Sequence, residues 1–391
     1  MSPAIAAIAG AAESEEIGKV PHKSALQLHA ESGRAAVLDA GLTMADIDGV
    51  ACAGESPVDV ADYLGIRADF LDGTMVGGSS FMLHVRHAAA AIAAGQCRAV
   101  LVTHGESGRS RVGKQPWAPA PQSMRGQFEV PYGGVYAPTA FPIGVLRYMK
   151  DFGVTREQIA AVPVAQRRWA ARNPRAMLRD EITVADVLAS RVIAHPLHLF
   201  ECCLVTDGGA AVVVTSVERA GGTRAPVYVL GAGEAAETSL VSTMDDLTHS
   251  AAFARAGRRA FDEAGITTAD VDHVMIYDAF AHTVLYGLEA LGFAGRGEAG
   301  AFVESGATSP GGSLPVNTNG GGLAYTHTGM YGMFAIQESV RQLRGEAAAQ
   351  VDDPRTSVVL GNGGSFMSAG VLVLGREADR GAAAVRERSV S

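Results

Sequence analysis

The chain lacks the features that define several large classes of protein. It has four cysteines, too few for a disulfide framework. No apolar run reaches the roughly 18 residues of a membrane-spanning helix, and the start of the chain has no basic segment typical of a signal peptide. Its net charge of −9 argues against a nucleic-acid-binding surface. We therefore expect a cytoplasmic globular protein that binds neither membrane nor nucleic acid.

Common active-site motifs are also missing. The sequence contains no GxxxxGK[ST], HExxH, CxxC or GxSxG motif. GAGEAAE at 231–237 lacks the third glycine of a dinucleotide fingerprint, and GRGEAG at 295–300 follows a predicted helix instead of a strand. His84 and His87 lie three residues apart on one predicted helix, but no third metal ligand is evident, so we interpret them as structural. We expect no metal site.

What the sequence does contain is an alternation of apolar strands and helices. Continuous apolar stretches predict buried strands at 3–10, 49–53, 99–103 and 210–215, and helical spacing predicts helices at 23–41 and 81–95. This alternation is typical of an α/β sheet that is covered on both faces. Residues 108–196, here called the excursion, interrupt the pattern with a stretch rich in proline, glycine and aromatics and then three predicted helices.

An internal repeat indicates that the chain is built from two halves. Gly33–Val50 and Gly257–Val274 align without a gap at an offset of 224, and ten of their eighteen positions are identical. Each copy reads as a helix, a glycine stop, a loop and a strand. Such identity predicts a duplication. We expect an N-terminal half at 1–220, which includes the excursion, and a C-terminal half at 221–391.

Gly311–Gly332, here called the glycine loop, is the stretch around which a site is predicted. Its 22 residues include seven glycines and no Asp, Glu, Lys or Arg, and it runs into a helical pattern that stops at Gly345. Glycines such as Gly321 and Gly322 let backbone approach a ligand closely, and a helix start offers free N–H groups to an anion. His327 would stay neutral there and donate a hydrogen bond to a carbonyl oxygen.

Two further segments carry polar residues at the ends of predicted strands. The first, VMIYDAFAH at 274–282, contains Tyr277, Asp278 and His282 where a strand meets a helix, the usual position of ligand contacts in α/β sheets. Asp278 alternatively caps a helix. The second, LGNGGSFMSAG at 360–370, is another glycine-rich turn after a strand. We expect both segments to meet the glycine loop.

The sequence resembles the thiolase superfamily, and within it the sterol-carrier-protein-X-like branch. The resemblance covers nearly the whole chain. It rests on HPLHLFECCLVTDGGAAVVVTS (195–216), IYDAFAHTVLYGLEALGF (276–293) and NTNGGGLAYTHTGMYGMF (317–334). It implies a five-layer αβαβα fold from two duplicated halves, a homodimer and acyl-CoA substrates. For the phosphates of coenzyme A, the excursion offers several arginines, namely Arg167, Arg168, Arg172 and Arg175.

The departures from that family are specific. Thiolases carry a nucleophilic cysteine at the start of the long helix of the first half, where this chain reads VGGSSF at 76–81. The turn that holds their second cysteine here reads Gly361-Asn362-Gly363-Gly364. Thr328 follows His327 in place of proline, and Tyr277 replaces the asparagine that anchors an oxyanion-hole water. Without a thiolate, Claisen condensation and thiolysis lose their nucleophile.

What remains is a site that can stabilise a thioester enolate, to which retro-aldol cleavage adds a base and an acid. The sequence thus resembles the steroid side-chain-cleaving aldolases of this superfamily. They split a β-hydroxyacyl-CoA into a ketone and a short acyl-CoA such as propionyl-CoA, without a cofactor beyond coenzyme A. They work with a small OB-fold, zinc-ribbon-bearing protein that belongs to the preceding hydratase.

The resemblance implies roles for individual residues. Tyr325 or Tyr331 is the acid/base, His282 or Tyr277 its counterpart, and His327 polarises the thioester carbonyl. The expected substrate-binding residues line the three segments and the start of the long helix of the first half: Ser79, Ser80, Asp278, Gly321, Gly322, Asn362 and Gly363.

Two alternatives stay open at the level of sequence. One is an acetyl-CoA C-acyltransferase or thiolase with a displaced nucleophile, namely Ser79, Ser80, Cys202 or Cys203. The other is a non-catalytic acyl-CoA-binding subunit. Convergence of His327, Tyr325 and Tyr277 within hydrogen-bond distance would favour the aldolase, and a serine or cysteine beside a base would favour the acyltransferase.

Overall fold

The computed structural model describes residues 4–378 except 114–118, 136 and 223–224. Within these residues nine strands form one mixed sheet, in the order β3-β2-β4-β7-β1-β8-β11-β10-β9. The first half contains β1 (Ala6–Glu13), α1 (Ala25–Asp39), η1 (Met44–Asp46), β2 (Gly49–Cys52), α2 (Pro57–Leu64), β3 (Phe70–Asp72), α3 (Ser80–Ala93), β4 (Ala99–Ser107), β7 (Asp207–Thr215) and α8 (Val217–Ala220). The predicted strands and helices of this half are thus confirmed, with ends that shift by a few residues.

The second half repeats this succession of elements. It contains β8 (Val227–Ala236), η4 (Val241–Thr243), α9 (Ala251–Ala264), η5 (Thr268–Asp270), β9 (His273–Ile276), α10 (Ala281–Ala290), α11 (Ala299–Glu304), α12 (Gly321–Ala324), α13 (Gly332–Arg344), β10 (Thr356–Gly363) and β11 (Ser368–Gly375). The helix predicted after the glycine loop is α13, and Gly345 ends it in the left-handed conformation, with φ of 74°.

The sheet order shows the duplication. From the centre outwards the two halves read β1-β7-β4-β2 and β8-β11-β10-β9. In each half the outermost of these pairs is parallel and the others are antiparallel. The elements η1 and η5, and likewise β2 and β9, begin and end at residues that differ by the predicted offset of 224. The two predicted copies therefore fold alike.

Equivalent residues also make equivalent contacts. The Ala11 N–H donates to Asp39 Oδ2 at 2.9 Å, and the Ala232 N–H donates to Glu263 Oε2 at 2.7 Å. A Cβ on Gly10 would lie 2.1 Å from the Ala36 carbonyl oxygen in α1, and a Cβ on Gly231 would lie 2.3 Å from the Ala260 carbonyl oxygen in α9. Only glycine allows the helices to approach their strands so closely. The position of the boundary between the halves, next to residues 223–224, stays a prediction.

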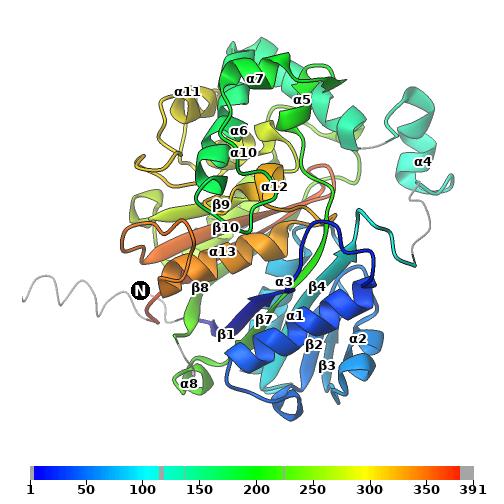
Figure 1. The fold of residues 1–391 in the computed structure, drawn as a ribbon, viewed down its shortest axis with the longest axis vertical. Helices are drawn as coiled ribbons and strands as arrows, with labels where there is room; N and C mark the ends of the chain where they lie inside the picture. Colours follow the sequence, from blue (N-terminus) through cyan, green and yellow to red (C-terminus); the bar gives the residue numbers. More distant parts are fainter. Residues whose placement is uncertain (1–3, 114–118, 136, 223–224, 379–391) are drawn as a thin grey trace, which may run out of the picture.

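The helices and the two halves of the sheet together form five layers. Helix α1 packs on β1, β4 and β7, and α9 packs on β8, β10 and β11, on the outer faces of the two halves. Helices α3 and α13 lie between the halves and contact strands of both. Figure 1 shows α13 between β9 and β10 of the second half and β1 and β7 of the first. The predicted αβαβα fold is confirmed. The two β layers are the sheet halves of the two repeats, and the pairing of β1 with β8 joins them into the one nine-stranded sheet.

The excursion packs mainly on the second half, although it belongs to the first in sequence. It contains α4 (Met124–Phe128), η2 (Val130–Tyr132), α5 (Ala137–Phe152), α6 (Arg156–Ala170), α7 (Val184–Ala189) and β5 (Val192–Ala194). Strand β5 pairs with β6 (Leu197–His198), which directly follows the excursion and precedes η3 (Leu199–Glu201). Helix α6 contacts α10, α11 and α12, as Figure 1 shows near the top of the view. Among the described residues, no helix combines the length and the apolar character needed to cross a membrane.

Candidate active site

The three segments singled out in the sequence meet where α3 and α13 begin. A Cβ on Gly332, the first residue of α13, would lie 2.0 Å from the Gly78 carbonyl oxygen. A Cβ on Gly78 would lie 1.7 Å from Cε1 of Tyr277, which directly follows β9. A Cβ on Gly77 would lie 2.6 Å from the backbone nitrogen of Gly364, in the turn after β10. The glycines let these four pieces of chain touch, so the two helix N-termini face one small region.

A tyrosine and a histidine form a hydrogen-bonded pair in this region. The Tyr277 hydroxyl lies 2.7 Å from Nε2 of His327, and the two residues are 5% and 9% exposed. Burial lowers the pKa of His327 to about 4, so the imidazole is neutral at pH 7. Burial also raises the pKa of Tyr277, against a hydrogen bond from the Tyr331 backbone that lowers it. At neutral pH both residues are uncharged and are joined by one hydrogen bond between the oxygen and the nitrogen.

Asp278 fixes the loop that carries this histidine. Its Oδ1 accepts a hydrogen bond from the Gly322 N–H at 2.6 Å, and its Oδ2 accepts one from the Leu323 N–H at 3.1 Å. Asp278 therefore binds the first turn of α12, whereas the N-cap of α10, the helix that follows Asp278 in sequence, is Phe280. Burial raises the pKa of Asp278 to about 7, and the loop N–H groups oppose that shift. Its predicted substrate contact stays a prediction.

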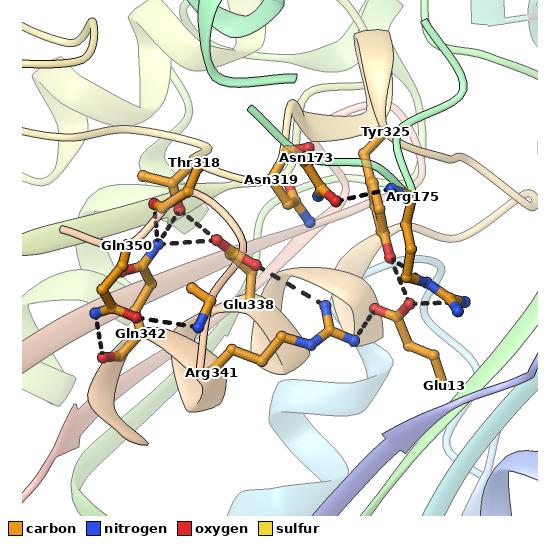
Figure 2. A network of polar contacts seen from close by, with 12 residues as sticks. Glu13, Asn173, Arg175, Thr318, Asn319, Tyr325, Glu338, Arg341, Gln342 and Gln350 are labelled. Atoms are coloured by element: carbon orange, nitrogen blue, oxygen red, sulfur yellow. Dashed lines mark hydrogen bonds and ion pairs between the residues drawn. The ribbon is translucent and has the colours of Figure 1, made fainter. Parts of the chain in front are cut away.

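The other two tyrosines of the glycine loop direct their hydroxyls elsewhere. Tyr331 donates to Oδ1 of Asn319 at 2.7 Å, and its ring lies 5.9 Å from that of Tyr277. Tyr325 is completely buried and donates to Oε2 of Glu13 at 2.5 Å, as Figure 2 shows. Burial raises the pKa of both phenols. The structure thus joins His327 with Tyr277 directly, but it places the Tyr325 hydroxyl in a separate polar cluster.

His282 lies in an aromatic cage. Its ring centroid is 5.4 to 6.1 Å from the ring centroids of Phe141, Phe280, Tyr286 and Phe366. Neither ring nitrogen has a hydrogen-bond partner among the described residues, and burial lowers the pKa to about 3. The predicted role of His282 as an acid/base counterpart is not tested by these contacts.

The expected substrate-binding residues at the start of α3 and after β10 lie together. The Ser79 hydroxyl is 2.9 Å from that of Ser368, and the Ser80 hydroxyl donates to the Gly77 carbonyl at 2.7 Å. A Cβ on Gly363 would lie 2.6 Å from Oγ of Ser79. The side-chain amide of Asn362 is buried, and within the described part of the chain neither of its polar atoms has a partner. Asn362 thus offers hydrogen-bonding groups to a ligand.

The structure gives no support to a displaced nucleophile. Ser79 and Ser80 form their hydrogen bonds with backbone groups and with another serine, not with a basic side chain. Burial raises the pKa of Cys202 to about 12 and also raises that of Cys203, so both are thiols at neutral pH. There is no space for a side chain at Gly361 either, since a Cβ there would lie 2.9 Å from the Ser79 Cα.

Several polar residues have structural roles that sequence alone did not separate from function. His84 lies within hydrogen-bond distance of the Thr74 carbonyl, and His87 lies between Asp72 and Glu234, contacts that agree with the structural interpretation of both histidines. Arg175, one of the arginines considered for coenzyme A, donates to the Ser14 carbonyl.

Sequence reasoning did not identify Glu13 or Thr206, whose Oγ1 accepts a hydrogen bond from the His327 N–H at 2.9 Å. The one sequence signal for Glu13 is that it is the acidic residue at the end of an otherwise apolar strand.

Known proteins resemble this chain over most of its length. A family model described as "Thiolase C-terminal domain-like" matches residues 233–376. A "Steroid side-chain-cleaving aldolase" of Thermomonospora curvata is 35% identical, over 96% of this chain and 99% of its own. A "17-hydroxy-3-oxo-4-pregnene-20-carboxyl-CoA lyase" of Mycobacterium tuberculosis is also 35% identical, over 86% of this chain and 91% of its own.

Solved structures give the same result. The "Ltp2-ChsH2(DUF35) aldolase" has a TM-score of 0.89 and 32% identity, covering 96% of this chain and 98% of that one. A monomeric SCP2-thiolase-like protein of Mycobacterium smegmatis, at 23% identity and a TM-score of 0.75 over 95% of this chain and 77% of that one, shares the fold. The chain therefore belongs to the thiolase superfamily, in the branch that contains the steroid side-chain-cleaving aldolases.

Proposed function

We propose that the chain is a carbon–carbon lyase that cleaves a β-hydroxyacyl-CoA by a retro-aldol reaction. The substrate is a steroid with a CoA-thioester side chain, and the products are a ketone and a short acyl-CoA such as propionyl-CoA. The two relatives at 35% identity are named for steroid side-chain cleavage and for a CoA lyase reaction. The observation that carries the proposal is the buried, neutral Tyr277–His327 pair at a site without a nucleophile.

The reaction needs one proton to move and one bond to break. A base removes the proton of the β-hydroxyl group, the bond between Cα and Cβ breaks, and its electron pair forms a thioester enolate. An acid then protonates Cα. We assign the proton transfer to Tyr277, which takes the hydroxyl proton as it passes its own to Nε2 of His327, and which returns a proton to Cα. No free coenzyme A and no water are consumed.

The enolate is placed where the scaffold favours negative charge. The N-termini of α3 and α13 meet beside the Tyr277 ring, and each helix start carries a partial positive charge. Such preorganised groups stabilise charge that develops in a transition state. The amide of Asn362 is available to donate a hydrogen bond to the thioester oxygen. In this proposal the site needs no cofactor beyond the coenzyme A of the substrate.

The excursion is the proposed binding region for the coenzyme A phosphates. Residues 108–196 contain thirteen Arg and Lys and six Asp and Glu, whereas the whole chain has a net charge of −9. A locally basic segment on an acidic protein attracts an anionic ligand. Arg167 and Arg175 already bind backbone carbonyls, so the other basic residues are the better candidates.

We further propose that the enzyme is a homodimer and works with a small OB-fold, zinc-ribbon-bearing partner. The similar Ltp2-ChsH2(DUF35) aldolase supports the partner, and the homodimer rests on the resemblance to thiolases. A cytoplasmic location fits the cysteines, since Cys52, Cys97, Cys202 and Cys203 are all unpaired.

Product analysis tests the reaction. The protein, alone and with the proposed partner, is incubated with β-hydroxyacyl-CoA and 3-ketoacyl-CoA steroids, with and without free coenzyme A, and products are identified by mass spectrometry. We expect a ketone and a short acyl-CoA from the hydroxy substrate, independent of free coenzyme A. Chain shortening of the keto substrate that requires free coenzyme A would instead identify a thiolase, and no product from either would favour a binding subunit.

A further inference from the structure

The carboxylate of Glu13 holds three parts of the chain that are remote in sequence. It lies at the end of β1, and its side chain is 2% exposed. Its oxygens lie 2.5 Å from the Tyr325 hydroxyl, 2.7 Å from Nη2 of Arg341 and 3.5 Å from Nη2 of Arg175 (Figure 2). These partners come from the glycine loop, from α13 and from the excursion.

The excursion also binds the glycine loop through the backbone. The Met177 N–H donates to the Tyr325 carbonyl at 3.1 Å, and the Leu178 N–H donates to the Ala324 carbonyl at 3.0 Å. The loop is therefore held on one side by residues 177–178 and on the other by Glu13. His327 follows two residues after Tyr325, so what fixes Tyr325 also fixes the backbone that carries the histidine.

A second set of contacts extends from Arg341 to Thr318, which lies in the glycine loop before α12. Nη1 of Arg341 lies 3.9 Å from Oε2 of Glu338, and Oε1 of Glu338 accepts a hydrogen bond from the Thr318 hydroxyl at 2.6 Å (Figure 2). Glu13 and Glu338 are each 2% exposed on the side chain. Buried charges are costly unless each keeps its partner, so this network tolerates few alternative arrangements.

The glycine loop requires such outside support. Seven glycines in 22 residues leave its backbone many accessible conformations. The hydrogen bond between Tyr277 and His327 needs a loop that is fixed to within a fraction of an ångström, because misplacement by about 1 Å can cost about 100-fold in rate. Asp278 fixes the first turn of α12, and Tyr325 is the residue that directly follows that helix. Thr206 bonds Thr326 and the backbone of His327, so the contacts of Tyr325 supply the support between these two points.

We propose that Glu13 is a positioning residue for the retro-aldol reaction: its carboxylate holds Tyr325, and thereby the loop, so that His327 stays against Tyr277. The inference rests on the proposed function. It also assigns Tyr325 a positioning role, in place of the acid/base role that the sequence suggested. Glu13 itself does not touch the substrate.

Two single variants and their combination test this assignment. Glu13→Gln keeps the shape of the side chain but removes the charge, and Tyr325→Phe removes the hydroxyl alone. Glu15→Gln is the matched control, an exposed glutamate two residues along the chain. For each we would measure kcat and KM of ketone formation, the pH profile of kcat and the melting temperature.

We expect Glu13→Gln and Tyr325→Phe each to lower kcat about 10- to 100-fold. KM should change by less than about 3-fold and the pH profile should keep its shape, because the groups that transfer the proton are intact. The double variant should be no slower than the slower single variant, since both changes break one unit. Glu15→Gln should behave as the wild type.

Other results would overturn the assignment. A folded Glu13→Gln variant with wild-type kcat would refute it. A second contradicting result concerns Tyr325→Phe. If this variant is far slower than Glu13→Gln, loses one limb of the pH profile, and if the two losses of kcat multiply in the double variant, Tyr325 is the acid/base. If Glu13→Gln does not fold, Tyr325→Phe decides alone by its pH profile. A wild type that forms no ketone would be a failure of the proposed function, not of this assignment.

Discussion

The starts of α3 and α13 are equivalent positions in the two halves, yet they differ in chemistry. Both helices lie between the halves of the sheet, and their N-termini meet. At the start of α3 stand two glycines, Gly77 and Gly78, and two serines. The Ser80 hydroxyl donates to the Gly77 carbonyl, and the Ser79 hydroxyl bonds that of Ser368 in the second half. Before α13 stand a neutral histidine and two tyrosines. The start of α3 thus offers small residues and backbone N–H groups, whereas the residues before α13 supply His327, one of the two side chains to which we assign the proton transfer.

The starts of α3 and α13 are coupled by direct packing in the folded structure. The Tyr277 ring lies directly against Gly78, where a Cβ would be 1.7 Å from the ring. The small residues at the start of α3 therefore make room for the aromatic ring of Tyr277, which the second half supplies. A larger side chain at position 78 would not fit beside this ring.

The largest effect should come from the reactive pair itself. Tyr277→Phe and His327→Ala should each lower kcat of ketone formation by about 100- to 10,000-fold, the usual contribution of acid–base catalysis. Steady-state kinetics with the β-hydroxyacyl-CoA would measure this. Tyr63→Phe, at an exposed tyrosine of α2, is the control and should leave kcat unchanged. Near-normal rates in both pair variants would move the chemistry to another group.

The next effect should come from filling the space at the start of α3. Gly78→Ala places a methyl group against the Tyr277 ring. We expect overpacking to cost about 1–3 kcal/mol of unfolding free energy, with a loss of kcat of at least about 10-fold as the ring shifts. Denaturant unfolding and kinetics would measure both. Gly222→Ala, where the nearest atom to a new Cβ is 3.9 Å away, is the control.

The pH dependence of kcat should reveal the buried state of His327. Its pKa is lowered by burial from the ordinary 6.5 to about 4, so the imidazole remains neutral until the pH falls through about 4. We expect kcat to stay level from pH 7 down to about 5 and to decline below that as His327 becomes protonated. Circular dichroism at each pH would show that the protein is folded. An acid limb between about 6.5 and 7 would contradict this expectation, and Asp278→Asn would then separate an exposed His327 from titration of Asp278, whose pKa burial raises to about 7.

The smallest effect concerns the structural role that α3 retains. His87 lies 2.7 Å from Asp72 of β3 and 3.0 Å from Glu234 of β8, so it links the two halves. The hydrogen bond to Asp72 raises its pKa above the ordinary 6.5. A raised pKa stabilises the fold below pH 6.5, and this contribution disappears as the pH rises through the folded-state value.

His87→Gln should therefore cost about 1 kcal/mol or less of unfolding free energy at pH 6, because the site is half-buried and screened. The cost should shrink at pH 9. Urea unfolding at the two pH values would measure it. An equal cost at both would contradict a role for the charge.

Much of the fold could be predicted because each copy of the duplicated unit shows recognisable local sequence patterns. The helix, glycine stop, loop and strand of each copy follow from apolar periodicity and from glycine at a helix end, which depend on neighbours in sequence. The same reasoning located the glycine loop and Tyr277. It could not tell which tyrosine would face His327, because Tyr325 and Tyr331 differ in direction only through contacts with Glu13 and Asn319.

The sequence by itself determined the α/β class, the two halves, and the absence of a cysteine at either expected nucleophile position. The class and the halves follow from composition and local spacing, whereas the two nucleophile positions are implied by the resemblance to thiolases. Only the tertiary structure decided that Tyr277 pairs with His327, that Asp278 holds α12, and that a glutamate from β1 anchors the loop. Each of these contacts joins residues 44 to 312 positions apart. Their geometry depends on how helices and strands pack, which no local pattern encodes.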